Sequence, residues 1–203
     1  NVTVNDTLNN KDSTGTRAVT IDTTAPVVTF NAQTPADNTN QSNTNIYVNV
    51  SVTEVNEINI SFRIYYSNGT LLNSTTYTDQ TRSINFTSLS DNTYEFNVTV
   101  ADNVSNKGTS GTRSVTVDTV FPTINITNPT VNNSNSSNNG LDILFTFTEI
   151  NPFECWYSND TYSVNRSTGG CGINITNITW SEGNHNVTIF VNDSANNVNR
   201  SSI

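Results

Sequence analysis

Apolar and polar side chains alternate in several short segments of this chain, and this alternation restricts the possible fold more than any other feature. Between residues 46 and 52 every second residue is isoleucine or valine, and the same period recurs at 58–64, 96–100 and 187–191. A period of two over four to eight residues is typical of a β-strand with one buried face. No segment keeps the period of 3.6 that an amphipathic helix requires. The sequence therefore predicts an all-β protein.

The sequence also repeats itself, and the length of the repeat predicts how the strands are grouped. The pattern of residues 1–26 returns 96 positions later at 97–122, with the same Gly-Thr-Arg and Asp-Thr-x-x-Pro strings. A third, partial copy runs over 187–197, 91 positions after the second. A unit of this length is close to the roughly 100 residues and seven short strands of an immunoglobulin-type sandwich. We therefore predict tandem immunoglobulin-like β-sandwiches of about seven strands each.

The repeat divides the chain into three parts, with a proline at each of two short joints. Residues 1–22 match the terminal strands of a preceding or partner domain, 26–118 form the first domain, and 122–203 form a second whose last strand is incomplete. The expected strands are 27–30, 46–52, 58–66, 71–77, 83–88, 93–101 and 112–117 in the first domain and 123–127, 141–148, 153–157, 161–166, 172–178 and 185–191 in the second.

This division leaves two interpretations of the chain open. The chain is either a window of a longer tandem array or a subunit whose N-terminal strands complete the C-terminal sandwich of the next copy. The second interpretation is strand addition at an exposed sheet edge. A head-to-tail contact of that kind does not close and builds a filament. The window is favoured because Asn1 falls inside a predicted strand rather than in a flexible leader.

Three strings of the sequence are distinctive, namely the joints at 21–26 and 115–122 and the loop at 191–197. Together they resemble the joints and the D-x-A-G-N loop of tandem bacterial and archaeal Ig-like domains from cell-surface proteins, with Asn196 in place of the glycine. The resemblance implies extracellular modules that serve as spacers, S-layer parts, adhesin stalks or appendages of enzymes.

Charge and motif content exclude several other classes of protein. Eight basic and 17 acidic residues give a net charge of −9, whereas nucleic-acid binding requires a basic face. No apolar run approaches the roughly 20 residues of a membrane span. The single histidine, His185, has no second histidine to bind a metal with, and the sequence holds no phosphate-binding or hydrolase motif. We predict that the chain is not an enzyme.

Asparagine, threonine and serine make up 93 of the 203 residues, and many of the asparagines lie in Asn-x-Ser/Thr sequons. Seven of these asparagines fall on the outward phase of predicted strands, where a bulky glycan can be accommodated. Covalent N-glycans are therefore expected, and the alternative is a plain polar strand surface. The candidate sites are Asn1, Asn5, Asn40, Asn49, Asn59, Asn68, Asn73, Asn85, Asn97, Asn103, Asn125, Asn132, Asn135, Asn159, Asn165, Asn174, Asn177, Asn186, Asn192 and Asn199.

Cys155 and Cys171 are the only cysteines and lie 16 residues apart. The segment that contains them, followed by 182–187, is similar to disulfide-bearing versions of the Ig-like family in archaeal surface proteins. In a secreted protein a disulfide is the expected state of such a pair. A zinc site would need four ligands, which two cysteines and one histidine do not supply.

Acidic residues recur at matching places near the joints. In an Ig-type sandwich the loops after the second and sixth strands and the incoming linker meet at one end. That end would gather Asp22, Glu54 and Asp102 in the first domain and Asp118, Glu149 and Asp193 in the second. Three carboxylates at a joint can hold Ca²⁺, which takes six to eight oxygen ligands. The alternative is that these side chains only accept hydrogen bonds from turn N–H groups. No other cofactor is expected.

These observations predict a structural, glycosylated, extracellular repeat protein of an archaeal or bacterial cell surface. It would act as a spacer, an S-layer element or a surface filament, with neighbouring copies of itself or flanking repeats as partners. One alternative is an adhesive module that binds a glycan or a protein, which exposed Tyr or Trp on the loops would favour. Another is a non-catalytic appendage of a secreted hydrolase, which only a flanking catalytic domain would reveal.

Overall fold

The computed structural model describes residues 1–131, 135–160, 166–176 and 178–203, and this part of the chain is all-β without a helix. The prediction of an all-β fold is therefore confirmed. Within the same residues no helix is long and apolar enough to cross a membrane.

The chain begins with an extended arm, residues 1–22. Strand β1 (Thr3–Asn5) pairs with β2 (Lys11–Ser13) in an antiparallel hairpin, and no strand follows until β3. Every residue from 1 to 21 is exposed, including Val19 and Ile21, whose exposed fractions are 84% and 85%. The arm thus carries the alternating pattern of a sandwich strand without burying its apolar side chains.

A first hydrophobic core packs between two sheets formed by residues 26–118, which we call module 1. One sheet has the order β3-β5-β8 and the other the order β4-β10-β9-β6-β7. Alternate side chains of the long central strands, among them Val48, Phe62, Phe96 and Val115, are almost completely buried between the sheets. The bounds are β3 (Val27–Phe30), β4 (Thr39–Gln41), β5 (Ile46–Thr53), β6 (Glu57–Tyr66), β7 (Leu71–Tyr77), β8 (Ser83–Phe86), β9 (Asn92–Asp102) and β10 (Lys107–Val117).

Residues 122–203, which we call module 2, surround a second and smaller core. One sheet pairs β11 with β12, and the other has the order β14-β13-β15-β16. Ile143, Phe145, Val187 and Ile189 lie at the centre of this core. The bounds are β11 (Thr123–Asn128), β12 (Leu144–Thr148), β13 (Pro152–Asn159), β14 (Arg166–Ser167), β15 (Val187–Asp193) and β16 (Val198–Ser202).

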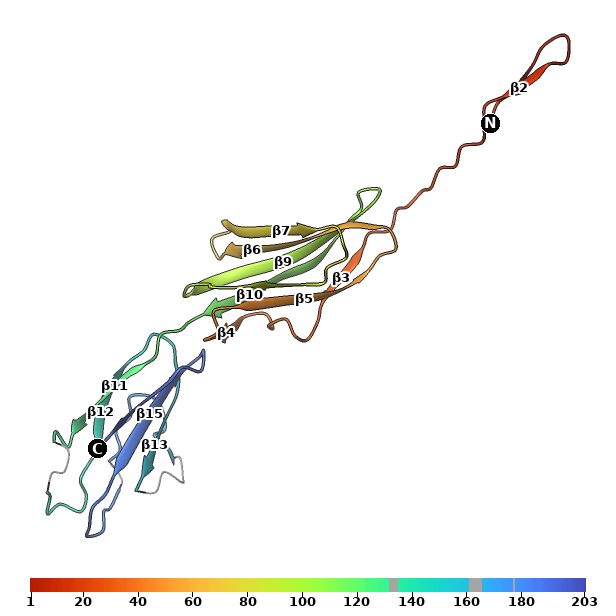
Figure 1. Cartoon of the computed structure of the whole chain (residues 1–203). Helices are drawn as coiled ribbons and strands as arrows, with labels where there is room; N and C mark the ends of the chain where they lie inside the picture. Colours follow the sequence, from red (N-terminus) through yellow and green to blue (C-terminus); the bar gives the residue numbers. More distant parts are fainter. Residues whose placement is uncertain (132–134, 161–165, 177) are drawn as a thin grey trace.

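The arm, module 1 and module 2 follow one another along a line, with the N-terminal hairpin at one extreme and module 2 at the other (Figure 1). Short linkers, residues 23–25 and 119–121, connect the three parts. The two joints therefore lie on the long axis of the molecule.

Two predicted strands of module 2 differ from the structure. In the described residues of the strand expected at 172–178, the pairing is a single bridge between Ile175 and Ile143. The side-chain oxygen of Asn174 accepts the hydrogen bond of the Phe145 N–H at 3.0 Å, and Gly172 has a positive φ of 85°, so a regular ladder does not form there. The strand expected at 161–166 falls mainly outside the described residues, and β14 begins at Arg166.

Candidate metal centres at the module joints

The six acidic residues singled out from the sequence gather into two clusters, one at each joint. In each cluster the nearest carboxylate oxygens all lie within 4.8 Å of one another. At joint 1 the end of the arm provides Asp22, the loop after β5 provides Glu54, and the end of β9 provides Asp102. At joint 2 the corresponding residues are Asp118, Glu149 and Asp193.

The third carboxylate of each cluster is fixed by its own loop. Oδ1 of Asp102 accepts hydrogen bonds from the N–H groups of Val104 at 2.9 Å and Asn106 at 2.8 Å, while the Asn106 side chain donates to Oδ2 at 2.7 Å. Burial alone would raise the pKa of Asp102, but these hydrogen bonds outweigh it and hold the pKa below the ordinary value. Asp102 is thus kept ionised at neutral pH.

The same loop occurs three times in the chain. In module 2, Asp193 accepts hydrogen bonds from the N–H groups of Ala195 and Asn197 and from the Asn197 side chain. In the arm, the hairpin loop from Asp6 to Asn10 repeats each of these contacts. The sequence motif Asp-x-x-x-Asn therefore specifies the loop by local hydrogen bonds alone, even where the loop is fully exposed.

The asparagine that ends the motif also holds the incoming linker. The Nδ2 of Asn106 lies 3.2 Å from both Asp22 O and Thr24 O, and the Nδ2 of Asn197 lies 2.8 Å from Asp118 O. Sequence reasoning missed this role. Asparagine is the commonest residue of the chain, and only recurrence at the same place in the repeat distinguishes these two.

A second pair of asparagines, Asn56 and Asn151, makes matching contacts at the two joints. Asn56 donates to the Asp22 carboxylate at 3.4 Å, and Asn151 donates to the Asp118 carboxylate at 3.2 Å. Glu54 accepts the N–H of Asn56, and Glu149 accepts the N–H of Asn151. The two joints are therefore built from the same residue types in the same contacts.

At joint 2 the linker is held from both modules. While Asn197 of module 2 holds Asp118, the next residue, Thr119, donates its N–H and its hydroxyl to Asp91 of module 1 at 3.0 and 2.9 Å. Asp91 lies in the loop before β9. Two adjacent residues, one at the end of module 1 and one in the linker, are thus anchored to different modules, which leaves few rotations free between the modules.

The clusters have the chemistry of a site for a hard cation. Each brings three carboxylates together, and the ion pairs among the described residues, Arg82 with Glu57 and His185 with Asp160, involve none of the six. Carboxylate and carbonyl oxygens are the ligands that Ca²⁺ prefers, and water completes its coordination. The residues present therefore fit calcium.

The sequons differ in the exposure of their asparagines. Asn192 is only 9% exposed and accepts the N–H of Glu154, so its side chain has no room for a glycan. Asn199 is half-buried and donates to Pro122 O at 2.8 Å. Asn132, Asn165 and Asn177 lie outside the described residues, and Asn49, Asn59, Asn97 and Asn159 are half-buried. The exposed sites are Asn1, Asn5, Asn40, Asn68, Asn73, Asn85, Asn103, Asn125, Asn135, Asn174 and Asn186.

Cys155 of β13 and Cys171 form a disulfide with a Cα–Cα distance of 5.0 Å. Cys155 is almost completely buried. The bridge ties β13 to the segment that leads to the isolated bridge at Ile175.

The single histidine closes a turn before β15. In module 1 the Tyr94 hydroxyl donates to Ser90 O at 2.9 Å, and in module 2 His185 Nε2 lies 2.9 Å from Ser181 O. His185 Nδ1 lies 3.0 Å from the Asp160 carboxylate. Because both ring nitrogens face acceptors, first Ser181 O and then Asp160, the pKa of His185 is raised. The histidine thus takes the place of a corner tyrosine.

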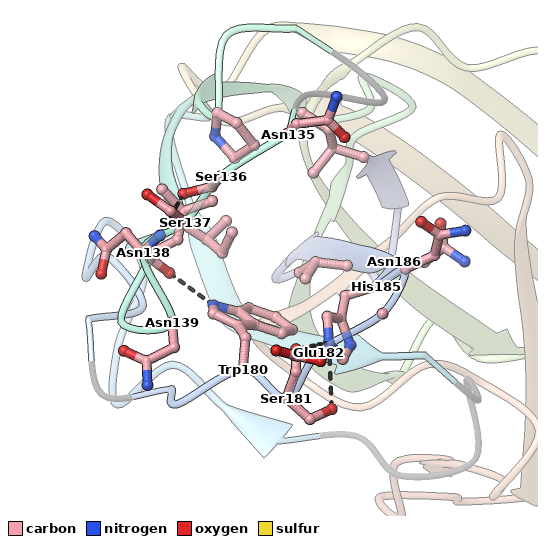
Figure 2. A pocket seen from close by; sticks show the side chains of 17 residues that line it. Asn135, Ser136, Ser137, Asn138, Asn139, Trp180, Ser181, Glu182, His185 and Asn186 are labelled. Atoms are coloured by element: carbon pink, nitrogen blue, oxygen red, sulfur yellow. Dashed lines mark hydrogen bonds between the residues drawn. The ribbon is translucent and has the colours of Figure 1, made fainter.

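A groove of about 930 Å³ opens beside this histidine (Figure 2). Residues 135–139 form one wall and 181–187 the other. Trp180 lies against His185, with 5.0 Å between the ring centroids, and its Nε1 donates to Leu141 O. Both tryptophans of the chain are half-buried, and Trp156 stacks on Phe190.

Comparison with known proteins supports the fold and nothing finer. No protein-family model and no curated protein matches the chain. Among solved structures, the fibronectin(III)-like modules of Clostridium thermocellum CbhA align with a TM-score of 0.51 and 16% identity over 87% of this chain and 91% of that chain. The amphioxus IgVJ-C2 molecule (TM-score 0.40, 14% identity, 80% of this chain and 96% of that one) and the BSP domain of a biofilm-associated protein (TM-score 0.31, 13% identity, 87% and 29%) are too distant to carry an argument.

Proposed function

We propose that this chain is a structural module pair of an archaeal or bacterial cell surface, in which β-sandwiches are strung in a line as a spacer, an S-layer element or a surface filament. The observation that carries the proposal is the near-identity of the two joints, down to single hydrogen bonds. A joint built twice from the same residue types fixes the incoming chain in the same way on the module that follows. That property serves a fibre or a spacer rather than a catalyst.

We further propose that the two carboxylate clusters bind Ca²⁺ and that the ion stiffens the joints. Without a cation, three carboxylates within 4.8 Å repel one another. With calcium, each ion would connect the linker to two loops of the following module. The ion therefore acts mechanically and takes part in no reaction.

Adding calcium to chelator-treated protein is expected to raise the transition temperatures of both modules. Binding to the folded state alone stabilises by about 2.7 kcal/mol when free calcium is a hundred times Kd. Differential scanning calorimetry measures both transitions, and X-ray scattering measures the maximum dimension, which should vary less once the joints are stiff.

Variants that replace one carboxylate of a cluster with a neutral amide make this test sharper, because they should raise stability without calcium and lower it relative to the parent chain with calcium. Glu54→Gln should stabilise module 1 in chelator, by relieving repulsion, and should remove its calcium response. Glu149→Gln should do the same for module 2 only. Glu95→Gln, outside the clusters, is the matched control. Transition temperatures that do not move with either calcium or chelator would contradict the calcium proposal.

N-glycans on the exposed sequons are the second part of the proposal. The chain has few charges and two lysines, so sugars would supply the solubility that surface charge usually gives. In protein isolated from its native cell surface, glycopeptide mass spectrometry should find glycans on exposed asparagines such as Asn73, Asn85 and Asn125 and none on Asn192. Unmodified asparagine at all of the exposed sequons would contradict it.

Among the rival functions, adhesion would be favoured by exposed Tyr or Trp on the loops, and the residues that the structure describes show none there. Neither Trp156 nor Trp180 lies exposed on a loop, and each packs against another aromatic ring. We therefore propose a structural role in which the modules contact copies of themselves, including head-to-tail addition of a strand.

A further inference from the structure

We propose that an N-glycan on Asn73 covers an apolar cavity at the open edge of the module 1 sandwich, between β7 and β8. The ligand of this cavity is thus the first sugar ring of a glycan attached to the same chain. The inference rests on the glycosylation part of the proposed function and gives one of the exposed sequons a structural role.

The edge is open because the two sheets of module 1 differ in width. The larger sheet has five strands and β7 at its edge, whereas the smaller has three strands and β8 at its edge (Figure 1). Among the described residues β7 pairs only with β6, and β8 only with β5. A cavity of about 290 Å³ lies between the two edge strands. Its volume is close to the roughly 300 Å³ at which small-molecule sites begin.

The lining of this cavity is suited to a sugar ring. Its apolar part consists of Ile64, Leu72, Ile84, Phe86 and Leu89. Thr87 and Ser88 add hydroxyl groups. A mainly apolar wall with a few polar groups is the usual composition of a small-molecule site, and a sugar ring offers C–H groups on its faces and hydroxyls around them. Leu72 is 38% exposed, so a ring over the cavity removes apolar surface from water.

The register of β7 places Asn73 on the side of the strand that faces the cavity. Asn73 pairs with Ile64 and Thr75 pairs with Phe62. Ile64 and Phe62 are both 0% exposed in the core. Residues directly opposite each other in a ladder share a face of the sheet, so Asn73 lies on the core side. It is nevertheless exposed, and it lines the cavity. A glycan on Asn73 therefore begins at the mouth of the cavity.

The sequence of β7 also lacks the usual protection of an edge strand. Natural edges are protected by charged residues, proline, bulges or short length. Residues 68–78 contain no charged residue and no proline, and β7 has seven residues. A register shift opposite Ile64 and Tyr65 affects only the start of the strand. The sequon Asn73-Ser74-Thr75 lies inside this edge, so a glycan there also keeps other strands from pairing with it.

Comparison of two expression hosts tests the inference in the full chain. Asn73→Gln is produced in a host that modifies the sequons and in one without N-glycosylation. In the glycosylated protein the variant should lower the calorimetric transition temperature of module 1 by about 4 °C or more, and in the unglycosylated protein by much less. Loss of the hydrogen bond from the Thr75 hydroxyl to Asn73 Oδ1 is common to both hosts and cancels. Asn40→Gln is the matched control, since Asn40 is an exposed sequon asparagine of β4 that does not line the cavity.

Thiol labelling gives a second readout that does not depend on stability. A maleimide should modify Leu72→Cys more slowly in the glycosylated protein than in the unglycosylated protein, because the sugar covers this side chain. Val55→Cys is the control and should react equally fast in both, since Val55 is 93% exposed and does not line the cavity. Peptide mapping verifies that the native disulfide is intact.

Glycopeptide mass spectrometry separates failure of this inference from failure of the glycosylation proposal. Glycans on other exposed sequons but none on Asn73 would overturn the inference alone. So would a glycan on Asn73 that changes neither the module 1 transition nor the labelling of Leu72→Cys. Unmodified asparagine at every exposed sequon would overturn both.

Discussion

Gly108→Ala is expected to destabilise module 1 by about 2–4 kcal/mol, although alanine usually stabilises a strand relative to glycine. Gly108 lies in β10 where the backbone of Pro26 crosses it at joint 1. A Cβ at Gly108 would lie 1.8 Å from Pro26 O and 2.7 Å from Pro26 C. Because both obstacles are backbone atoms, no side-chain rotation relieves the overlap, and either the linker or β10 must move.

The distribution of tryptophan allows this effect to be assigned to one module. Trp156 and Trp180 both lie in module 2, so tryptophan fluorescence follows module 2 alone and calorimetry follows both modules. The Gly108→Ala chain should lose stability only in the transition that fluorescence does not report. Gly15→Ala, in the exposed arm with no atom within 4 Å, is the control. A module 1 transition within about 0.5 kcal/mol of the parent chain would show that the crossing at Pro26 is not as tight as described.

At joint 2 a different residue occupies the position where the last strand meets the proline of the linker. The counterpart of Gly108 in module 2 is Asn199, whose side chain donates to Pro122 O at 2.8 Å. One joint thus relies on the absence of a side chain and the other on a hydrogen bond from one. Joints that share their carboxylates and asparagine clamps still differ in how closely the linker approaches the last strand.

The sequence alone was enough to place the carboxylates. Glu54 and Asp102 follow strands with a clear alternation of apolar and polar residues, and Asp22 has a counterpart in the repeat at Asp118. In an Ig-type sandwich the loops that hold these residues meet at one end, so the three carboxylates are expected to lie together. The bounds of β5, β6 and β9 follow from the same alternation, to within one or two residues.

Other features were beyond the reach of the sequence because their signals are short or common. Strand β4 has three polar residues without alternation and forms only by pairing with β10. The roles of Asn106 and Asn197 are hidden among 37 asparagines. The segment 172–178 keeps an alternating pattern, yet the side chain of Asn174 takes a bond that a ladder would need. In each case a contact with a distant part of the chain determines the local structure, and the local sequence pattern gives no sign of that contact.

The segment that passes from one sheet to the other is held differently in the two modules. This difference predicts that the disulfide contributes to the stability of module 2. In module 1, β8 pairs with β5 over four residues, and Arg82, just before β8, makes a two-point ion pair with Glu57 of β6 at 2.9 and 2.6 Å. In module 2, the described residues of the corresponding segment make a single bridge, at Ile175. The Cys155–Cys171 bond replaces the missing ladder.

Removing this bond is therefore expected to destabilise module 2 by about 3 kcal/mol, the value of the chain-entropy model for a loop of this length. Reduction of the parent chain, or the double variant Cys155→Ala with Cys171→Ala, should lower the urea midpoint of tryptophan fluorescence. The module 1 transition should not move, and it serves as an internal control in the same sample. The double variant should also be indifferent to reductant. An equal loss in both modules, or a loss below about 1 kcal/mol in module 2, would mean that the bridge at Ile175 and the packing around Trp180 already hold this part of the sandwich without the covalent bond.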